Sequence, residues 1–349
     1  MLKNRRRFIK ELSVLGLLSS LPNVLLSKEN NFLSGKQTDD AKIWACLLHL
    51  SFNFASGIKN YGGIREEFEN SESLWNDALV KMANSGINMV LINLDDSVQW
   101  DSHPEIAVRN AWTTSRLRNE LDKIRKLGIE PIPMLNFSAT HDAWLKTYSR
   151  MVSTKEYYKV CSDLIAEATY LFNKPRFFHL GMDEETAAHQ QRSDYVVVRQ
   201  NDLWWGDFYF LIGEVEKAGA RPWVWSDYVW HHPEMFYKKM PKSVVQSNWY
   251  YGEAFNPKLL DEFTQKRVNT YIDLAARGYD QIPTGSNDQN NPKSIGNTVE
   301  FARKNFNDSK LLGFLQTFWK PTIEQYRNLI IEGIELTGNA RKLYERSQK

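Results

Sequence analysis

Three junctions in the sequence share one pattern, in which a helix-like segment ends at a glycine and a strand-like segment follows at once. These junctions are centred on Gly86, Gly128 and Gly219. Glycine adopts the left-handed backbone conformation that closes a helix more readily than other residues do. Repeated helix–glycine–strand junctions therefore predict a chain built from repeated αβ units.

Short apolar segments of strand type recur along the chain with little alternation of polar and apolar residues, as expected of strands covered on both faces. Amphipathic helix patterns separate most of them, for example over residues 71–85 and 114–127. The first strand is not followed by the glycine-rich phosphate loop of an open doubly wound sheet. We therefore predict an α/β fold, a single-domain (β/α)8 TIM barrel. Its strands are predicted to begin near Ile43, Asn88, Ile129, Arg176, Arg221, Ser243, Val268 and Leu311.

The first 41 residues are set apart from this pattern. Residues 5–10 resemble the twin-arginine export signal of bacteria, and the apolar segment after them is too short to span a bilayer stably. We predict a twin-arginine signal segment at 1–27, a linker at 28–41 and the barrel at 42–349. The Tat export machinery would carry the chain across the inner membrane to the periplasm, leaving a mature protein with no stable membrane span.

The composition is that of a globular protein, with 42% hydrophobic and 25% charged residues. The chain has 44 basic and 42 acidic residues, of which residues 1–27 hold five basic and one acidic residue. Residues 28–349 therefore hold 39 basic and 41 acidic residues and are close to neutral. No basic tract interleaved with aromatic residues occurs, so nucleic acid is not an expected partner. Cys46 and Cys161 lie in a strand-like and a helix-like pattern, which favours buried free thiols, while export leaves a disulfide open.

Chemically versatile side chains follow several predicted strands, at the strand ends where barrel active sites lie. Strand four runs into Asp183 and Glu184, and tryptophans close other strands. Tryptophan offers flat faces for stacking on sugar rings, and carboxylates bind hydroxyls and transfer protons. Taken singly, such an acid can be a helix N-cap and such a tryptophan can pack the barrel mouth. Agreement among six strands favours a site, with candidates His141, His179, Asp183, Glu184, Trp225, Asp227, Trp249, Tyr271, Asp273 and Trp319.

The stretch from His179 to Glu184 resembles the His-x-Gly-Gly-Asp-Glu signature of glycoside hydrolase family 20, the β-N-acetylhexosaminidases. Residues 133–141 resemble that family's Pro-Glu-x-Asp-x-Pro-Gly-His segment, and residues 271–273 match its Tyr-x-Asp on strand seven. The resemblance covers about residues 43–320. Trp225, Trp249 and Trp319 fall where the family places the three tryptophans of its first sugar pocket.

This resemblance implies a retaining, substrate-assisted glycoside hydrolase that acts on a glycan with β-linked N-acetylhexosamine (GlcNAc or GalNAc). Glu184 would be the general acid and then the general base, and Asp183 would hold the acetamido N–H of the substrate. Tyr271 would hydrogen-bond the acetamido carbonyl oxygen. Repulsion between the adjacent acids predicts that Glu184 stays protonated while Asp183 is ionised. Of the remaining candidates, Asp227 and Asp273 would bind sugar hydroxyls. His141 and His179 would each either contact substrate or support the residues that do, and no cofactor or metal ion is expected.

The sequence departs from the family pattern at four places. Met182 stands in place of the second glycine and Asn136 in place of an aspartate. Strand one ends without the family's arginine, and Pro321 stands where the family has a glutamate two residues after Trp319. These departures predict an intact reaction centre with an altered grip on the far side of the sugar.

Two other classes of function stay open. A metal-dependent sugar isomerase or epimerase on the same barrel would use Glu184, Asp227, His179 or Asp273 as ligands. A non-hydrolytic glycan-binding protein would keep the pocket without turnover. Glu185 is assigned to the helix start after strand four rather than to the site.

Overall fold

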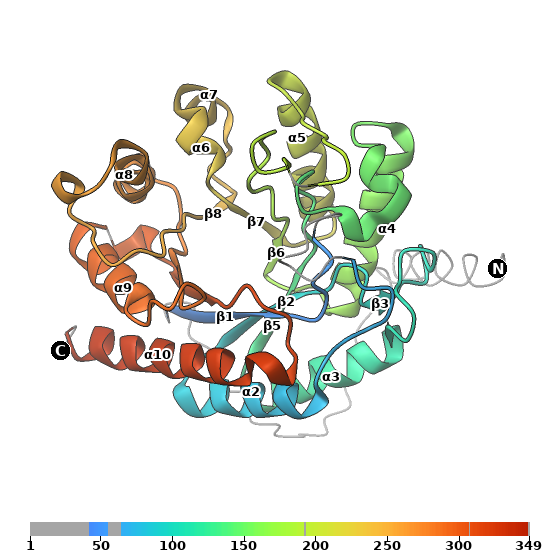
Figure 1. Cartoon of the computed structure of the whole chain (residues 1–349), viewed down its shortest axis with the longest axis horizontal. Helices are drawn as coiled ribbons and strands as arrows, with labels where there is room; N and C mark the ends of the chain where they lie inside the picture. Colours follow the sequence, from blue (N-terminus) through green and yellow to red (C-terminus); the bar gives the residue numbers. More distant parts are fainter. Residues whose placement is uncertain (1–41, 55–63, 192, 307, 348–349) are drawn as a thin grey trace, which may run out of the picture. The chain divides into compact units, whose positions relative to one another are not determined.

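A parallel sheet curves around the centre of the chain in the computed structural model, which describes residues 42–54, 64–191, 193–306 and 308–347 (Figure 1). Across those residues, eight strands pair in parallel, each with its neighbour in space. Isolated parallel bridges from Gln246 to Gln281 and from Trp249 to Thr284 join the first and last strands, so the predicted barrel is confirmed. In spatial order the strands are β8 (Val245–Ser247), β7 (Arg221–Trp225), β6 (Phe177–His179), β5 (Glu130–Met134), β2 (Met89–Asn93), β1 (Ile43–His49), β10 (Gly313–Thr317) and β9 (Thr284–Ser286).

Helices connect most of the strands and cover the outside of the sheet, with α2 and α10 packed side by side (Figure 1). None of the helices in the described part of the chain is both long and apolar enough to cross a membrane. Two short strands, β3 (Val98–Gln99) and β4 (Trp112–Thr113), pair with each other outside the barrel. The helices are α2 (Glu72–Ser85), α3 (Thr114–Lys126), α4 (Lys155–Leu171), α5 (Asp202–Lys217), α6 (Tyr228–His231), α7 (Pro233–Lys239), α8 (Glu262–Ala276), α9 (Ser294–Asn305) and α10 (Arg327–Arg346).

Side chains along each strand alternate between two apolar cores. On β1, Ala45 and Leu47 point into the barrel interior, whereas Trp44, Cys46 and Leu48 pack in the layer between sheet and helices. Both faces of the strand are therefore buried, which explains why its sequence shows no polar alternation. Cys46 and the other cysteine, Cys161, are both buried and free.

The helix–glycine–strand junctions have the backbone conformation that the sequence predicts. Gly86, Gly128 and Gly219 have φ angles of 76°, 78° and 90°. Each lies between the end of a helix and the start of the next strand, where a left-handed residue ends the helix. The αβ repeat inferred from these three positions is confirmed.

The prediction for strand seven is wrong. The segment that begins near Val268 belongs to α8, which is capped by Asp261, whose side chain accepts a hydrogen bond from Thr264 N–H at 3.0 Å. One face of this helix buries Val268, Tyr271 and Leu274. The segment resembles a strand over a short window because Val268, Thr270 and Tyr271 are β-branched or aromatic, whereas the spacing of three between its buried apolar residues is that of a helix.

The strand that completes the barrel is instead β9, a Thr-Gly-Ser segment with no large apolar side chain. Gly285 allows close packing there, because a Cβ atom at this position would lie 2.8 Å from the Cα atom of Ile295. The predicted signal segment (1–27) and linker (28–41) lie outside the described residues.

Candidate active site

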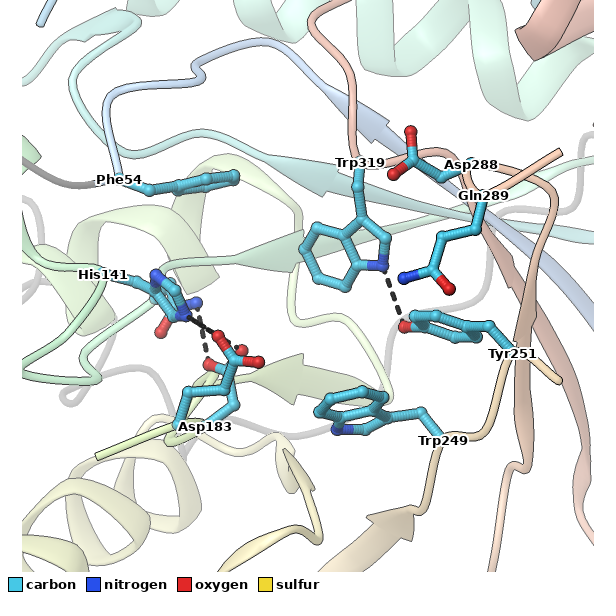
Figure 2. Close-up of a pocket in the computed structure, with 10 residues that line it drawn as sticks. Phe54, His141, Asp183, Trp249, Tyr251, Asp288, Gln289 and Trp319 are labelled. Atoms are coloured by element: carbon cyan, nitrogen blue, oxygen red, sulfur yellow. Dashed lines mark hydrogen bonds and ion pairs between the residues drawn. The ribbon is translucent and has the colours of Figure 1, made fainter. Parts of the chain in front are cut away.

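A pocket of about 150 Å³ opens at the carboxyl ends of the barrel strands (Figure 2). Its lining comes from segments that follow β1, β5, β6, β8, β9 and β10. Asp183 and His141 lie on one side, and the rings of Trp249, Tyr251 and Trp319 lie across from them (Figure 2). The lining residues are Phe54, Asn136, His141, Asp183, Glu184, Trp249, Tyr251, Asp288, Gln289 and Trp319.

The turn after β6 carries the two acids on a strained backbone. Gly181, Met182 and Glu184 have φ angles of 73°, 70° and 56°, and the last two are in a region that residues with a Cβ atom rarely occupy. A Cβ atom on Gly181 would lie 1.9 Å from Oδ1 of Asn136, so this position requires glycine. Backbone strain of this kind is concentrated at functional sites.

Asp183, Glu184 and His141 form one charged cluster. His141 Nε2 lies 3.4 Å from Asp183 Oδ2 and 3.2 Å from Glu184 Oε2. Asn136 Nδ2 donates a hydrogen bond to the other oxygen of Asp183 at 3.1 Å. The structure thus brings together three of the predicted site residues, and adds Asn136, which the sequence places at a strand end.

The charges in this cluster set its protonation. Burial alone would lower the pKa of His141, but the carboxylates of Asp183 and Glu184 raise it well above its usual value. Burial alone would raise the pKa of Glu184, but the hydrogen bond and charge of His141 bring it below its usual value. The expectation that Glu184 is protonated in the free pocket is therefore wrong, because His141 holds the proton and outweighs repulsion between neighbouring acids.

Hydrogen bonds to the backbone fix Glu184 from two sides. Its N–H donates to Asp227 Oδ2 at 2.7 Å, and its carbonyl oxygen accepts from Thr140 Oγ1 at 2.8 Å. Asp227, predicted to bind substrate, does not line the pocket, and one of its oxygens is used to hold the Glu184 turn. Burial, together with the charges of Asp183 and Glu184, raises the pKa of Asp227 to about 8.

This raised pKa predicts a pH-dependent effect of the substitution Asp227→Asn. In the unfolded chain the carboxyl ionises near its ordinary pKa of about 4, whereas in the fold it stays neutral up to about 8. Its contribution to stability is therefore present below about 4 and is lost as the pH rises toward 8. We expect the melting temperature of the variant, relative to the wild type, to rise by at least about 2 °C between pH 5 and pH 8. Asp273→Asn, on the exposed side of α8, is the control and should show no such change with pH. If the melting temperatures of Asp227→Asn and the wild type differ by the same amount at pH 5 and pH 8, the raised pKa of Asp227 is contradicted.

Glu185 is buried in an ion-pair network behind the turn, and does not start a helix as predicted. Its carboxylate pairs with Arg199, and Oε1 also accepts a hydrogen bond from Ala139 N–H at 3.0 Å. Arg199 also lies 3.2 Å from Asp207, and the side chains of all three charged residues are at most 3% exposed. This network ties the acid-bearing turn to the loop after β5 and to α5.

Three rings face the acids across the pocket and form its aromatic wall, defined as Trp249, Tyr251 and Trp319. Trp319 Nε1 donates to the hydroxyl oxygen of Tyr251 at 2.8 Å, and Tyr251 stacks on Trp249 with ring centroids 5.3 Å apart. Burial raises the pKa of the Tyr251 hydroxyl, which therefore keeps its proton. Phe54 closes the side next to His141, with ring centroids 5.8 Å apart.

Two predicted site residues lie beneath the pocket rather than in its lining. His179 is fully buried, its Nδ1 accepts from Gly181 N–H at 3.1 Å, and burial lowers its pKa to about 3, so it is neutral. Its ring packs 4.5 Å from that of Trp225, which is itself buried and lies 5.7 Å from Trp319. Trp225 was predicted to contact the sugar, and His179 either to bind substrate or to support the site. Their position makes both of them supports of the turn and of Trp319.

Tyr271 and Asp273 are outside the site, because both lie on α8 rather than on a barrel strand. Tyr271 is buried among Phe255, Phe301 and Phe306, and Asp273 is exposed on the helix surface. The prediction that they bind substrate is wrong for this physical reason. For the same reason Asp273 cannot belong to the metal-ligand set considered from the sequence. A different set, His141, Asp183 and Glu184, has ligand atoms that lie within 4.8 Å of one another.

Besides Asn136, sequence reasoning missed four lining residues. Tyr251 follows Trp249 by two positions, and Phe54 lies five residues beyond β1, so both are close to segments already identified. Asp288 and Gln289 follow β9, the strand that the apolar pattern did not reveal. Asp288 Oδ1 lies 2.7 Å from Lys320 Nζ, in the residue after Trp319.

The α/β barrel is the fold that this chain shares with several solved structures of glycoside hydrolase family 20 and related hexosaminidases. The exo-β-N-acetylglucosaminidase of Vibrio harveyi, in complex with N-acetylglucosamine, aligns with 88% of this chain at 13% identity and a TM-score of 0.58. The N-acetyl-β-hexosaminidase of Streptomyces plicatus aligns with 85% at 12% identity and a TM-score of 0.59. The chitobiase of Flavobacterium johnsoniae aligns with 87% at 16% identity and a TM-score of 0.58.

The aligned region spans 57%, 64% and 50% of those three proteins, less than two-thirds of each. At these identities the likeness is one of fold. No protein-family profile matches the sequence, and no curated protein matches it either.

Proposed function

We propose that the protein is a retaining glycoside hydrolase that uses the 2-acetamido group of a β-linked N-acetylhexosamine as its nucleophile. The observation that carries this proposal is the pair Asp183–Glu184, held on a strained turn and facing three aromatic rings across one pocket. The rings offer apolar faces to a sugar, and the acids offer acceptors and a proton path. The fold shared with N-acetylhexosaminidases of other organisms supports the same reaction class.

Glu184 would protonate the leaving glycosidic oxygen and then activate water. The required proton is available from His141, whose Nε2 lies 3.2 Å from Glu184 Oε2. Because the two groups titrate as a coupled pair, the proton belongs to the pair and passes to Glu184 as the glycosidic oxygen approaches. Asp183 contacts the same ring nitrogen of His141 at 3.4 Å, so it lies beside the proton that is transferred.

Asp183 would accept the acetamido N–H and stabilise the positive charge of the oxazolinium intermediate. The carbonyl oxygen of the acetamido group needs a hydroxyl donor, a role that the sequence resemblance gave to Tyr271. We assign it to Tyr251, a residue of the pocket lining whose hydroxyl is already oriented by the hydrogen bond from Trp319 Nε1. Asp288 and Gln289 would bind the sugar hydroxyls on the far side, where the family's arginine and glutamate are missing.

A panel of p-nitrophenyl glycosides tests the proposal. We expect release of p-nitrophenol from an N-acetyl-β-glucosaminide or N-acetyl-β-galactosaminide, and much slower release from the plain β-glucoside and β-galactoside. Preference for a sugar without the acetamido group would rule out substrate assistance. Binding of N-acetylhexosamine without turnover of any substrate would instead indicate a non-hydrolytic glycan-binding protein.

A metal-dependent sugar isomerase is the second candidate, because His141, Asp183 and Glu184 could together ligate a divalent cation. A ligand histidine must be neutral, whereas the neighbouring carboxylates favour a protonated His141. Dialysis against a chelator separates the two functions. Hydrolysis that persists without metal supports the hydrolase, and an activity restored only by added cation supports the isomerase.

We also propose that the protein is exported by the twin-arginine route, on the basis of the arginines and Phe8-Ile9-Lys10 near its start. Residues 1–36 fused to a cytoplasmic reporter enzyme should carry the reporter to the periplasm. Replacement of Arg5, Arg6 and Arg7 by lysine should retain it in the cytoplasm, and equal export of both fusions would count against this route.

A further inference from the structure

A second hollow of about 390 Å³ adjoins the active-site pocket, and we call it the outer hollow. The two cavities share Glu184, Trp249, Tyr251 and Gln289 in their linings. A general acid acts on the bond between the sugar and its leaving group, and Glu184 borders both spaces. If the sugar occupies the active-site pocket, the outer hollow is therefore where the leaving group lies.

Arg267 of α8 lines the outer hollow between aromatic rings. Its guanidinium carbon lies 4.4 Å from the ring centroid of Trp249, 4.7 Å from that of Trp230 and 5.7 Å from that of Tyr250. Stacking of this kind engages the flat faces of a guanidinium and leaves the N–H groups along its edge available for hydrogen bonds.

The N–H groups of Arg267 are poorly satisfied within the described chain. Nη2 donates one long hydrogen bond, to the carbonyl oxygen of Trp249 at 3.5 Å, and Nε is buried with no partner. No carboxylate of the described residues lies within ion-pair distance of Arg267, in contrast to Arg199, which has two such partners. A partly buried guanidinium without an anion loses hydration that nothing replaces, and burial lowers its pKa accordingly.

Other charged groups in the outer hollow do not take the place of that anion. The carboxyl groups of Glu184 and Asp227 also line it, but the first pairs with His141, and the second accepts from the Glu184 N–H and has a pKa raised to about 8. His189 and His231 line the same space and carry no negative charge. A ligand that enters the hollow therefore meets the terminal Nη groups of a guanidinium that has no carboxylate partner among the described residues.

We propose that Arg267 recognises an anionic substituent, a carboxylate or a sulfate, on the residue to which the N-acetylhexosamine is linked. Both groups present two or more oxygens in the spacing of a guanidinium edge, which allows paired hydrogen bonds. This inference rests on the proposed hydrolase function and adds its leaving-group specificity. The substrate class would be an acidic glycan in which N-acetylhexosamine precedes a uronic acid or a sulfated sugar.

Three disaccharides test the proposal on the purified full chain: N-acetylhexosamine β-linked to glucose, to glucuronic acid and to glucose 6-sulfate, through the same linkage. We expect kcat/KM to be about tenfold to a hundredfold higher for one of the acidic substrates than for the neutral one, the range of a hydrogen bond to a charged group. Preference for the uronic acid assigns a carboxylate, and preference for the sulfated sugar assigns a sulfate. Arg267→Gln should bring the ratio of acidic to neutral kcat/KM close to one.

Arg277→Gln is the matched control, because Arg277 follows the last residue of α8 and lines neither cavity. Its guanidinium carbon also stacks on an aromatic ring, 4.0 Å from the ring centroid of Tyr237. The Arg277→Gln variant should retain the preference for the acidic substrate. Arg267→Lys keeps the charge but loses the planar edge and should retain a smaller preference, which keeps the test valid if Arg267→Gln unfolds.

Two results would overturn the proposal: no preference for either acidic substrate in the wild type, or a preference that survives in Arg267→Gln. If no disaccharide and no aryl glycoside is cleaved, the hydrolase proposal has failed. The anion site is then decided by calorimetry with methyl β-glucuronide, methyl β-glucoside and methyl β-glucoside 6-sulfate. Binding of an acidic glycoside that disappears in Arg267→Gln supports the site, and equal or absent binding of all three overturns it.

Discussion

We expect Glu184→Gln to lower kcat/KM for an N-acetylhexosamine disaccharide by about 10²- to 10⁴-fold, the range for loss of general acid–base catalysis. Glutamine has nearly the same shape and keeps a hydrogen bond to His141, but it carries no proton for the glycosidic oxygen. The melting temperature should change little. Steady-state kinetics and thermal unfolding of the purified variant measure both quantities.

The leaving group distinguishes a general acid from a residue that only binds substrate. p-Nitrophenolate departs without a proton, whereas a sugar alkoxide does not, so the loss should be larger for the disaccharide than for the aryl glycoside. Glu234→Gln, on the exposed surface of α7, is the control and should leave both rates unchanged. Equal losses on the two substrates would show that Glu184 does not act as the acid.

We expect Arg199→Met to destabilise the fold by about 3–5 kcal/mol, the usual cost of removing one partner from a buried ion pair. Methionine fills similar space, but it leaves the carboxylates of Glu185 and Asp207 buried without their cation. For a domain of this size the melting temperature should fall by about 10 °C. Adding Glu185→Gln should recover part of the loss, because it removes one of the uncompensated charges.

Arg109→Met provides the comparison for this effect. Arg109 also pairs with two acids, Glu66 and Glu67, but its side chain is 63% exposed. Exposed ion pairs contribute about 1 kcal/mol or less, so this variant should unfold within a few degrees of the wild type. A loss of stability at Arg199 no greater than at Arg109 would contradict the role assigned to the buried network.

The barrel could be predicted from sequence because its signals are local. Helix-ending glycines and apolar strands lie where a short window of residues reveals them, and seven of the eight predicted strands begin within two residues of the observed ones. β9 could not be found in this way, since Thr284, Gly285 and Ser286 are buried by close backbone packing rather than by large apolar side chains. The amphipathic face of α8 supplied a more apolar segment nearby.

The acid side of the pocket was predictable for the same reason. Parallel strands end at one face of a barrel, so residues at the ends of β5 and β6 must meet, and His141, Asp183 and Glu184 do. It is harder to infer from sequence how far up a strand the pocket begins. His179 and Trp225 were therefore placed in the pocket, although their side chains are buried beneath it. Long-range pairing, such as Arg199 with Glu185, leaves no pattern in a single sequence.

The closure of the barrel has a mechanical consequence for the pocket. β8 and β9 meet through isolated bridges, whereas β1 and β2 pair over five consecutive residues. The aromatic wall begins on the segment after β8, and Asp288 and Gln289 follow β9, so this side of the pocket borders a seam with few backbone bonds. Such seams open locally at low free-energy cost. The acids stand on a turn held by hydrogen bonds with the Asp227 and Thr140 side chains, so a movement at this seam would shift Asp288 and Gln289 while the reacting carboxylates keep their place.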